Sequence, residues 1–169
     1  MHFKKVNKTD LQVNPITMFS DNWPLLTAGN EEAGYNTMTI SWGHIGAIWN
    51  KPTIAVYIRP QRYTKEFVDS HELFTVSVLP SEYKKALMYL GRASGRDEDK
   101  VAKVGLTPII DAGTTYFEEA EMVFVCRKLY QKSIKEEAFL DVTIVDTMYP
   151  KKDFHDLYIG EIVDILVKI

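Results

Sequence analysis

The feature that most constrains this fold is a series of short segments rich in β-branched and aromatic residues. Gly, Pro or Asn bounds these segments, which is typical of β-strands. Most lie too close together for the helical crossover that parallel strands need. The spacing therefore predicts a mainly β fold, an antiparallel barrel with a few helical excursions. The predicted strands are residues 36–42, 45–49, 53–58, 74–78, 121–130 and 157–168.

Capping residues predict where the helices begin and end. Thr64 is a candidate N-cap for a helix that reaches Ser70, and Ser81 for one that ends at Gly91. A third segment, residues 141–149, has apolar residues at helical spacing although its β-branched content favours a strand, and we expect a helix. The 169 residues contain no repeat and no linker-like stretch. One domain over residues 1–169 is therefore expected.

The charge and cysteine content narrow the possible functions. Lys and Arg number 20 against 23 Asp and Glu, both signs are dispersed, and the net charge is −3, so nucleic acid is not an expected partner. No apolar run approaches the roughly 18 residues that span a bilayer, so we expect a cytoplasmic chain without membrane partners. The one cysteine, Cys126, fits a small buried residue, and no metal site is expected.

Nucleotide-binding motifs are missing from the sequence. It contains neither G-x-G-x-x-G after a strand nor G-x-x-x-x-G-K-[ST]. The nearest approach, Gly43-His-Ile-Gly46, has two glycines and lies between predicted strands. A dinucleotide, if used, is therefore not held in a Rossmann crevice.

The first candidate site segment is the strand NTMTISWG at residues 36–43. Its hydroxyl-bearing face is either a solvated surface or one edge of a ligand site. A planar, amide-edged ring such as a flavin needs backbone and small polar groups along its edge, and such a strand supplies them. Strand alternation places Asn36, Met38, Ile40 and Trp42 on one face and Thr37, Thr39 and Ser41 on the other.

The second segment, RPQRYT at residues 59–64, lies between a predicted strand and a predicted helix. Arg59 and Arg62 there flank the unpaired N–H groups and the positive dipole end of that helix. Guanidinium groups and helix N-termini both bind phosphate, so this turn predicts a phosphate site. Alternatively, the two arginines pair with surface carboxylates.

The third segment is the polar loop that begins at Ser94. Gly95 relaxes the backbone, and Ser94, Arg96 and Lys100 offer further donors to a phosphate. On its own, the segment is equally typical of a solvated loop before a short helix.

Five stretches, in order, resemble the flavin reductase-like, FMN-binding split-barrel family, and flavoredoxin-type members most of all. The resemblance implies a six-stranded split barrel that forms a homodimer, with one FMN per subunit near the interface. The stretches are NTMTISWG at 36–43, WNKP at 49–52, RPQRYT at 59–64, SGRDEDKVAKVGLTP at 94–108 and HDLYIGEIV at 155–163.

The same resemblance assigns roles to residues. Positions in the first segment contact the flavin ring and ribityl chain, and those in the second and third hold the phosphate. The implied FMN-binding residues are Asn36, Thr37, Met38, Thr39, Ile40, Ser41, Trp42, Arg59, Arg62, Tyr63, Thr64, Ser94, Gly95 and Lys100.

Three functions follow as hypotheses. The first is an NAD(P)H:flavin oxidoreductase in which hydride passes from a nicotinamide to flavin N5. The second is a flavoredoxin-like protein that takes electrons from a redox protein, and the third is a flavin-binding module without catalysis. No catalytic residue is assigned, although the resemblance places His155 near the open flavin face, where it either orients a substrate or only begins a strand. Trp42 is a ring contact or a packing residue, and Trp49 packs in the core or at a dimer interface.

Overall fold

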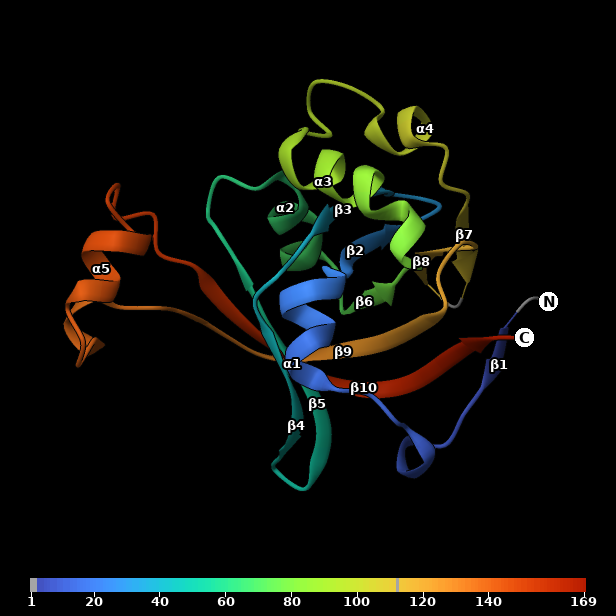
Figure 1. Cartoon of the computed structure of the whole chain (residues 1–169), viewed down its shortest axis with the longest axis horizontal. Coiled ribbons are helices and arrows are strands. Elements are labelled where there is room, and N and C mark those ends of the chain that lie inside the picture. The colour runs from blue at the N-terminus through green and yellow to red at the C-terminus, as the bar shows by residue number, and fades with distance from the viewer. Residues whose placement is uncertain (1–2, 112) are drawn as a thin grey trace.

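The computed structural model describes residues 3–111 and 113–169 and is mainly β (Figure 1). The strands are β1 (Phe3–Lys5), β2 (Leu25–Asn30), β3 (Gly34–Thr39), β4 (Gly43–Ile48), β5 (Lys51–Ile58), β6 (Leu73–Val78), β7 (Pro108–Asp111), β8 (Thr114–Phe117), β9 (Met122–Ser133) and β10 (Asp156–Lys168). The helices are α1 (Pro15–Thr17), α2 (Tyr63–Ser70), α3 (Lys84–Arg92), α4 (Lys100–Val104) and α5 (Thr143–Met148).

One antiparallel sheet forms the body of the molecule. Its strands follow the order β3-β2-β6-β9-β10-β5-β4, β1 pairs with the end of β10, and β7 and β8 form a separate hairpin. The strands at the two ends of this path, β3 and β4, are joined directly by residues 40–42. The antiparallel, mainly β prediction is confirmed. The six-strand count is too low for this sheet, because β1 and β2 carry no clear alternation and were not recognised.

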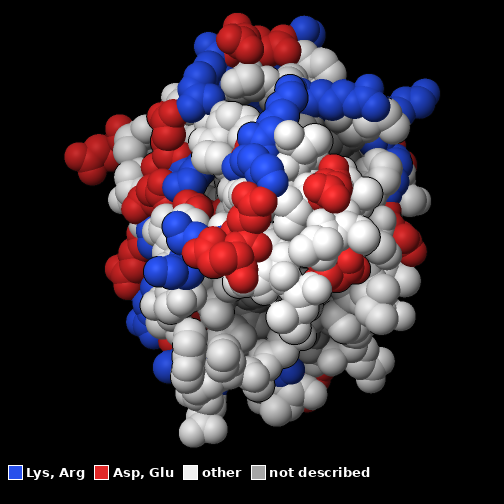
Figure 2. Space-filling view, turned by 90° about the vertical axis from the view of Figure 1, so that its left-hand side faces the viewer, with Lys and Arg blue, Asp and Glu red and all other residues white. Residues whose placement is uncertain are grey.

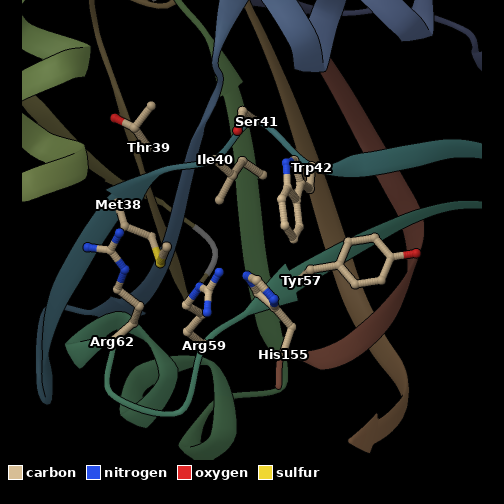
Figure 3. A pocket seen from close by; sticks show the side chains of 9 residues that line it. All are labelled: Met38, Thr39, Ile40, Ser41, Trp42, Tyr57, Arg59, Arg62 and His155. Carbon is tan, nitrogen blue, oxygen red and sulfur yellow. The ribbon is translucent and has the colours of Figure 1, made fainter. Parts of the chain in front are cut away.

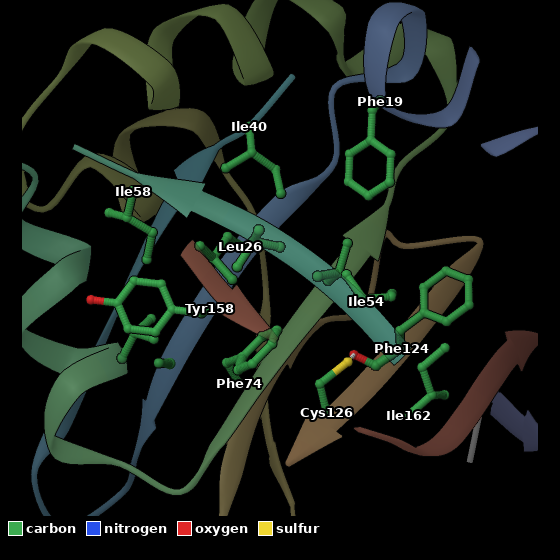
Figure 4. Packing of buried hydrophobic residues seen from close by; sticks show 14 of the residues in the cluster. Phe19, Leu26, Ile40, Ile54, Ile58, Phe74, Phe124, Cys126, Tyr158 and Ile162 are labelled. Carbon is green, nitrogen blue, oxygen red and sulfur yellow. Dashed lines mark hydrogen bonds between the residues drawn. The ribbon is translucent and has the colours of Figure 1, made fainter. Parts of the chain in front are cut away.

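The barrel interior is filled by apolar side chains from alternate positions of its strands (Figure 4). Ile54, Phe74 and Phe124 are fully buried there, and Cys126 lies beside them as the small apolar residue that was predicted. Burial raises the pKa of the Cys126 thiol, which keeps it protonated. A Cβ at Gly160 would lie 2.6 Å from the Phe74 ring, so the packing of that ring against β10 favours glycine there.

A second apolar cluster, which includes Leu25, Leu87 and Phe117, packs α3 and α4 against the sheet. It holds the helices and the loop after them over the end of β3. No helix in the described ranges is long and apolar enough to cross a membrane.

Both predicted N-caps are wrong. Arg62 occupies the N-cap position of α2, and Thr64 lies in the first turn, where its Oγ1 accepts a 2.8 Å hydrogen bond from Asn36 Nδ2. Ser81 instead begins a short 3₁₀ turn, and α3 runs through Gly91 to Arg92. The Thr64 hydroxyl is therefore used in a contact with β3 and not as a helix cap. Residues 141–149 do contain a helix, α5, although it is shorter than predicted.

The predicted strand 36–42 ends early, at Thr39. The Ile40 N–H donates to the Pro24 carbonyl at 2.9 Å, and the chain then crosses to β4. The expected row of hydroxyls is broken: Ser41 lies beyond the strand and is exposed, and Thr37, within it, is buried with its Oγ1 2.7 Å from that of Thr27. Alternation cannot continue through a segment that has left the sheet.

Candidate functional site

Two neighbouring cavities share Met38, Arg59 and Arg62 in their walls. The basic cavity, of about 390 Å³, is lined by Asn36, Met38, Arg59, Gln61, Arg62, Tyr63, Thr64, Arg92, Ala93, Ser94, Gly95, Lys100 and Asp153. The aromatic cavity, of about 210 Å³, is lined by Met38, Thr39, Ile40, Ser41, Trp42, Tyr57, Arg59, Arg62 and His155 (Figure 3).

Two cations of the basic cavity, buried Lys100 and half-buried Arg62, are held by backbone carbonyls. Arg62 donates from Nη1 to the Gly91 carbonyl at 2.8 Å, and its pKa is lowered by burial and by the nearby Arg59. Lys100 donates to the carbonyls of Leu90 and Ala93, each at 3.0 Å. Burial lowers the pKa of Lys100 to about 8, with a further contribution from Arg62. Lys100 thus satisfies carbonyls at the end of α3 while it contributes charge to the cavity.

Arg59 is bound by an internal carboxylate. Its Nη1 lies 2.7 Å from Asp153 Oδ2, its Nη2 donates to the Met148 carbonyl at 2.9 Å, and the guanidinium lies 5.1 Å from the Tyr149 ring centroid. Gln61 donates to the same Asp153 oxygen at 2.9 Å. The alternative considered from sequence, arginine paired with a carboxylate, therefore holds for Arg59.

The loop after α3 passes unusually close to β3. An added Cβ at Gly95 would lie 2.2 Å from Asn36 Oδ1 and 3.2 Å from the Tyr63 ring. Asn36 in turn donates to Thr64 on α2. Glycine is therefore required where this loop, β3 and α2 meet at the wall of the basic cavity.

Trp42, Tyr57 and His155 give the second cavity its aromatic character, and Figure 3 shows the rings of Trp42 and His155 next to each other in its wall. The two ring centroids are 4.8 Å apart, and His155 Nδ1 lies 2.8 Å from Tyr149 Oη. The pKa of His155 is lowered to about 4, mainly by burial and further by Arg59. His155 is therefore a neutral imidazole at pH 7.

The structure brings together every predicted cofactor-binding residue except Thr37, whose side chain lies in the core. Arg96 lies outside both cavity walls, where it stacks on Tyr63 and pairs with Glu66. Sequence reasoning missed Tyr57, Gln61, Arg92, Ala93 and Asp153. Of these, only Gln61, within the RPQRYT stretch, stood in a quoted motif.

A larger apolar cavity, of about 720 Å³, lies on the far side of Trp42 and shares Ser41 and Tyr57 with the aromatic cavity. It is roofed partly by residues 134–155, called here the arm, which carry α5 and extend away from the barrel (Figure 1). Within the described residues, no group of three or more His, Cys, Asp or Glu is placed to hold a metal ion.

Comparison with known proteins identifies the family. A family model described as "Flavin reductase like domain" matches residues 18–168. The chain belongs to the flavin reductase-like family. The flavin reductase-like, FMN-binding split-barrel fold predicted from the sequence is confirmed by solved structures.

Two of these structures cover 98% of the chain. An FMN-binding domain of a flavin reductases-like enzyme from Shewanella baltica has a TM-score of 0.69 at 14% identity, over 77% of its own chain. Flavoredoxin from Desulfovibrio vulgaris has a TM-score of 0.68 at 24% identity, over 76% of its chain.

A curated relative is the high molecular weight rubredoxin of Moorella thermoacetica, 29% identical over 117 residues. That match covers 69% of this chain and 43% of the relative, so this chain spans less than half of it.

Proposed function

We propose that this protein binds FMN with its phosphate in the basic cavity and its ring in the aromatic cavity, and acts as an NAD(P)H:flavin oxidoreductase. The main observation in support is that the two cavities adjoin and share Met38, Arg59 and Arg62 in their walls. One cavity is rich in cations, and the other adds the rings of Trp42, Tyr57 and His155 to the shared Met38, Arg59 and Arg62. This is the division of chemistry that a phosphorylated aromatic heterocycle requires.

The residues present fit that cofactor. Arg62 keeps guanidinium donors beyond the one bound to Gly91, Ser94 adds a hydroxyl, and the first turn of α2 contributes unpaired backbone N–H groups. Met38, Ile40 and Trp42 present apolar surface toward a ring. The close approach at Gly95 leaves the loop backbone near the same cavity.

When bound, FMN supplies N5 as the acceptor of hydride from a nicotinamide. The chain's own contribution is to position and to shield. If the Tyr149 hydroxyl donates to His155 Nδ1, the imidazole proton lies on Nε2, where it is available to a substrate oxygen. His155 is then a substrate-orienting residue that remains uncharged because of its low pKa.

A second candidate function is electron transfer from a redox protein. It is favoured by the similarity to the high molecular weight rubredoxin and to a flavoredoxin. A non-catalytic flavin module would use the same binding residues. Steady-state oxidation of NADH and NADPH separates the first function from the other two, and reduction by a ferredoxin-like donor alone selects the second.

We further propose a homodimer. Leu140, Val142 and Met148 on the arm are 101%, 67% and 47% exposed, and Trp49 at the β4–β5 turn is 53% exposed. Figure 2 shows the arm side of the molecule, where charged groups are sparse in the lower part. A second copy would cover this apolar surface.

We also propose a cytoplasmic location for the protein, because its unpaired, buried Cys126 suits a reducing compartment.

The deciding experiment compares FMN with riboflavin, which lacks the phosphate. We expect the purified protein to show a flavin spectrum, and to bind FMN about 100-fold more tightly than riboflavin because charge-assisted phosphate bonds contribute about 3 kcal/mol. Equal affinities would mean that the basic cavity does not hold the phosphate. No binding of either flavin would refute the proposal as a whole.

A further inference from the structure

The basic cavity contains an anion of its own. Arg59, Arg62, Arg92 and Lys100 contribute positive charge to its wall, and Asp153 is the one carboxylate among the described lining residues. Asp153 comes from the arm, far in sequence from the turn that carries Arg59 and Arg62. A carboxylate in a site that attracts anions needs a physical explanation.

Asp153 occupies donors that a phosphate would otherwise use. Its Oδ2 atom is 2.7 Å from Arg59 Nη1 and 2.9 Å from Gln61 Nε2, so a single oxygen is bound by two of the cavity's donors. Gln61 and Arg59 also lower the pKa of Asp153, which keeps the carboxylate charged. The carboxylate is thus placed where an oxyanion would be recognised.

We propose that Asp153 is an internal competitor for the flavin phosphate, which lowers FMN affinity and couples the cofactor site to the arm. This inference rests on the proposed function, since it requires the phosphate to enter the basic cavity. The phosphate displaces the Asp153 carboxylate from Arg59 and Gln61, and no covalent bond changes. Asp153 therefore sets how readily the protein exchanges its flavin.

The arm is coupled to the cofactor site because Arg59 contacts the arm at several points. Arg59 binds the Met148 carbonyl at 2.9 Å, contacts the Tyr149 ring and pairs with Asp153. A phosphate that draws Arg59 inward loosens these contacts together. FMN loading consequently releases the attachment of the arm to the turn at Arg59.

The test replaces Asp153 by Asn, which removes the charge and keeps the shape. Asp146→Asn is the matched control, because Asp146 is an exposed carboxylate on α5 of the same arm. Titrations use FMN and riboflavin, with thermal unfolding to verify folding. We expect Asp153→Asn to bind FMN on the order of tenfold more tightly than the wild type, with riboflavin affinity unchanged and Asp146→Asn within about twofold.

Unchanged or weaker FMN binding in folded Asp153→Asn would overturn the inference, because Asp153 would then only orient Arg59. Asp153→Ser, which also removes the charge, must give the same FMN to riboflavin ratio. If wild type and variants all fold but bind no FMN, the proposed function itself fails. Amide hydrogen exchange in residues 143–155 should quicken when the wild type binds FMN, and slower or equal exchange contradicts the coupling.

Discussion

The basic cavity and the arm lie beside each other but differ in how their side chains are stabilised. In the cavity, polar groups form hydrogen bonds within the chain: Arg62 and Lys100 donate to backbone carbonyls, and Asn36 donates to Thr64. On the arm, Leu140 and Val142 lie in solvent with nothing packed over them. The cavity's polar groups are paired within one chain, whereas apolar side chains of the arm are exposed in one chain.

This difference determines which measurements can test each region. Directional hydrogen bonds fix the cavity whatever the protein concentration, so ligand affinity and unfolding should report on it. Apolar surface has no direction and is buried only by association, so the arm should respond to concentration.

The largest expected effect comes from removing Arg59 and Arg62, the two arginines shared by both cavities. In Arg59→Ala/Arg62→Ala we expect FMN affinity to fall by a factor of about 100 to 10,000, because two charge-assisted contacts contribute about 1.5–3 kcal/mol each. Fluorescence titration with FMN measures the affinity of the wild type and of the variant. Arg127→Ala is the control, since Arg127 is exposed and pairs with Glu161 outside both cavities. Retained FMN affinity in the double variant would place the phosphate elsewhere.

A second test uses two glycines. Gly95→Ala puts a Cβ 2.2 Å from Asn36 Oδ1, whereas Gly46→Ala in β4 meets nothing within 4 Å. We expect the first change to cost about 2 kcal/mol in unfolding free energy or the equivalent in FMN affinity, and the second under about 1 kcal/mol. Urea unfolding and FMN titration measure both. Equal effects would show that the loop relaxes freely and that the cavity wall is not rigid.

The same contrast explains what the sequence could predict. Arg59, Arg62 and Gly95 lie in short sequence motifs whose chemistry can be predicted without a structure. All three line the cavities. Asp153 reaches the cavity only because the arm folds back through Arg59, and Arg92 only because α3 continues past Gly91. Such placements depend on tertiary contacts between distant segments.

The strands of the fold also divide into those that the sequence predicts and those that it does not. Strands with strong β-branched runs, such as β5 and β9, were predicted, because alternation there reflects one buried face. β2 was missed, since its residues are buried on both faces and show no alternation. Thr37 was misplaced because its hydroxyl pairs with that of Thr27 on β2 in the core, a cross-strand contact that the sequence does not reveal.

His155, where the cavity wall meets the arm, gives a third prediction. Its pKa is about 4 in the folded chain and near 6.5 unfolded, so the unfolded chain binds more protons between these values. Stability therefore falls as pH drops through this window, by about 2 kcal/mol from pH 7 to pH 5. His155→Gln, which cannot ionise, should flatten that part of the profile in chemical denaturation. An equally steep profile in the variant would assign the loss to other groups.

The smallest expected effect lies on the arm. Leu140→Ser should change unfolding free energy by no more than about 0.5 kcal/mol, because its side chain is 101% exposed in one chain. If the arm completes itself with a second copy, the same change raises the dimer dissociation constant about tenfold, which sedimentation velocity measures. Ile110→Ser on β7, 42% exposed and remote from the arm, is the matched control. A wild type that stays monomeric at all concentrations, or equal weakening by both serines, would mean that the exposed arm surface does not mediate dimerisation.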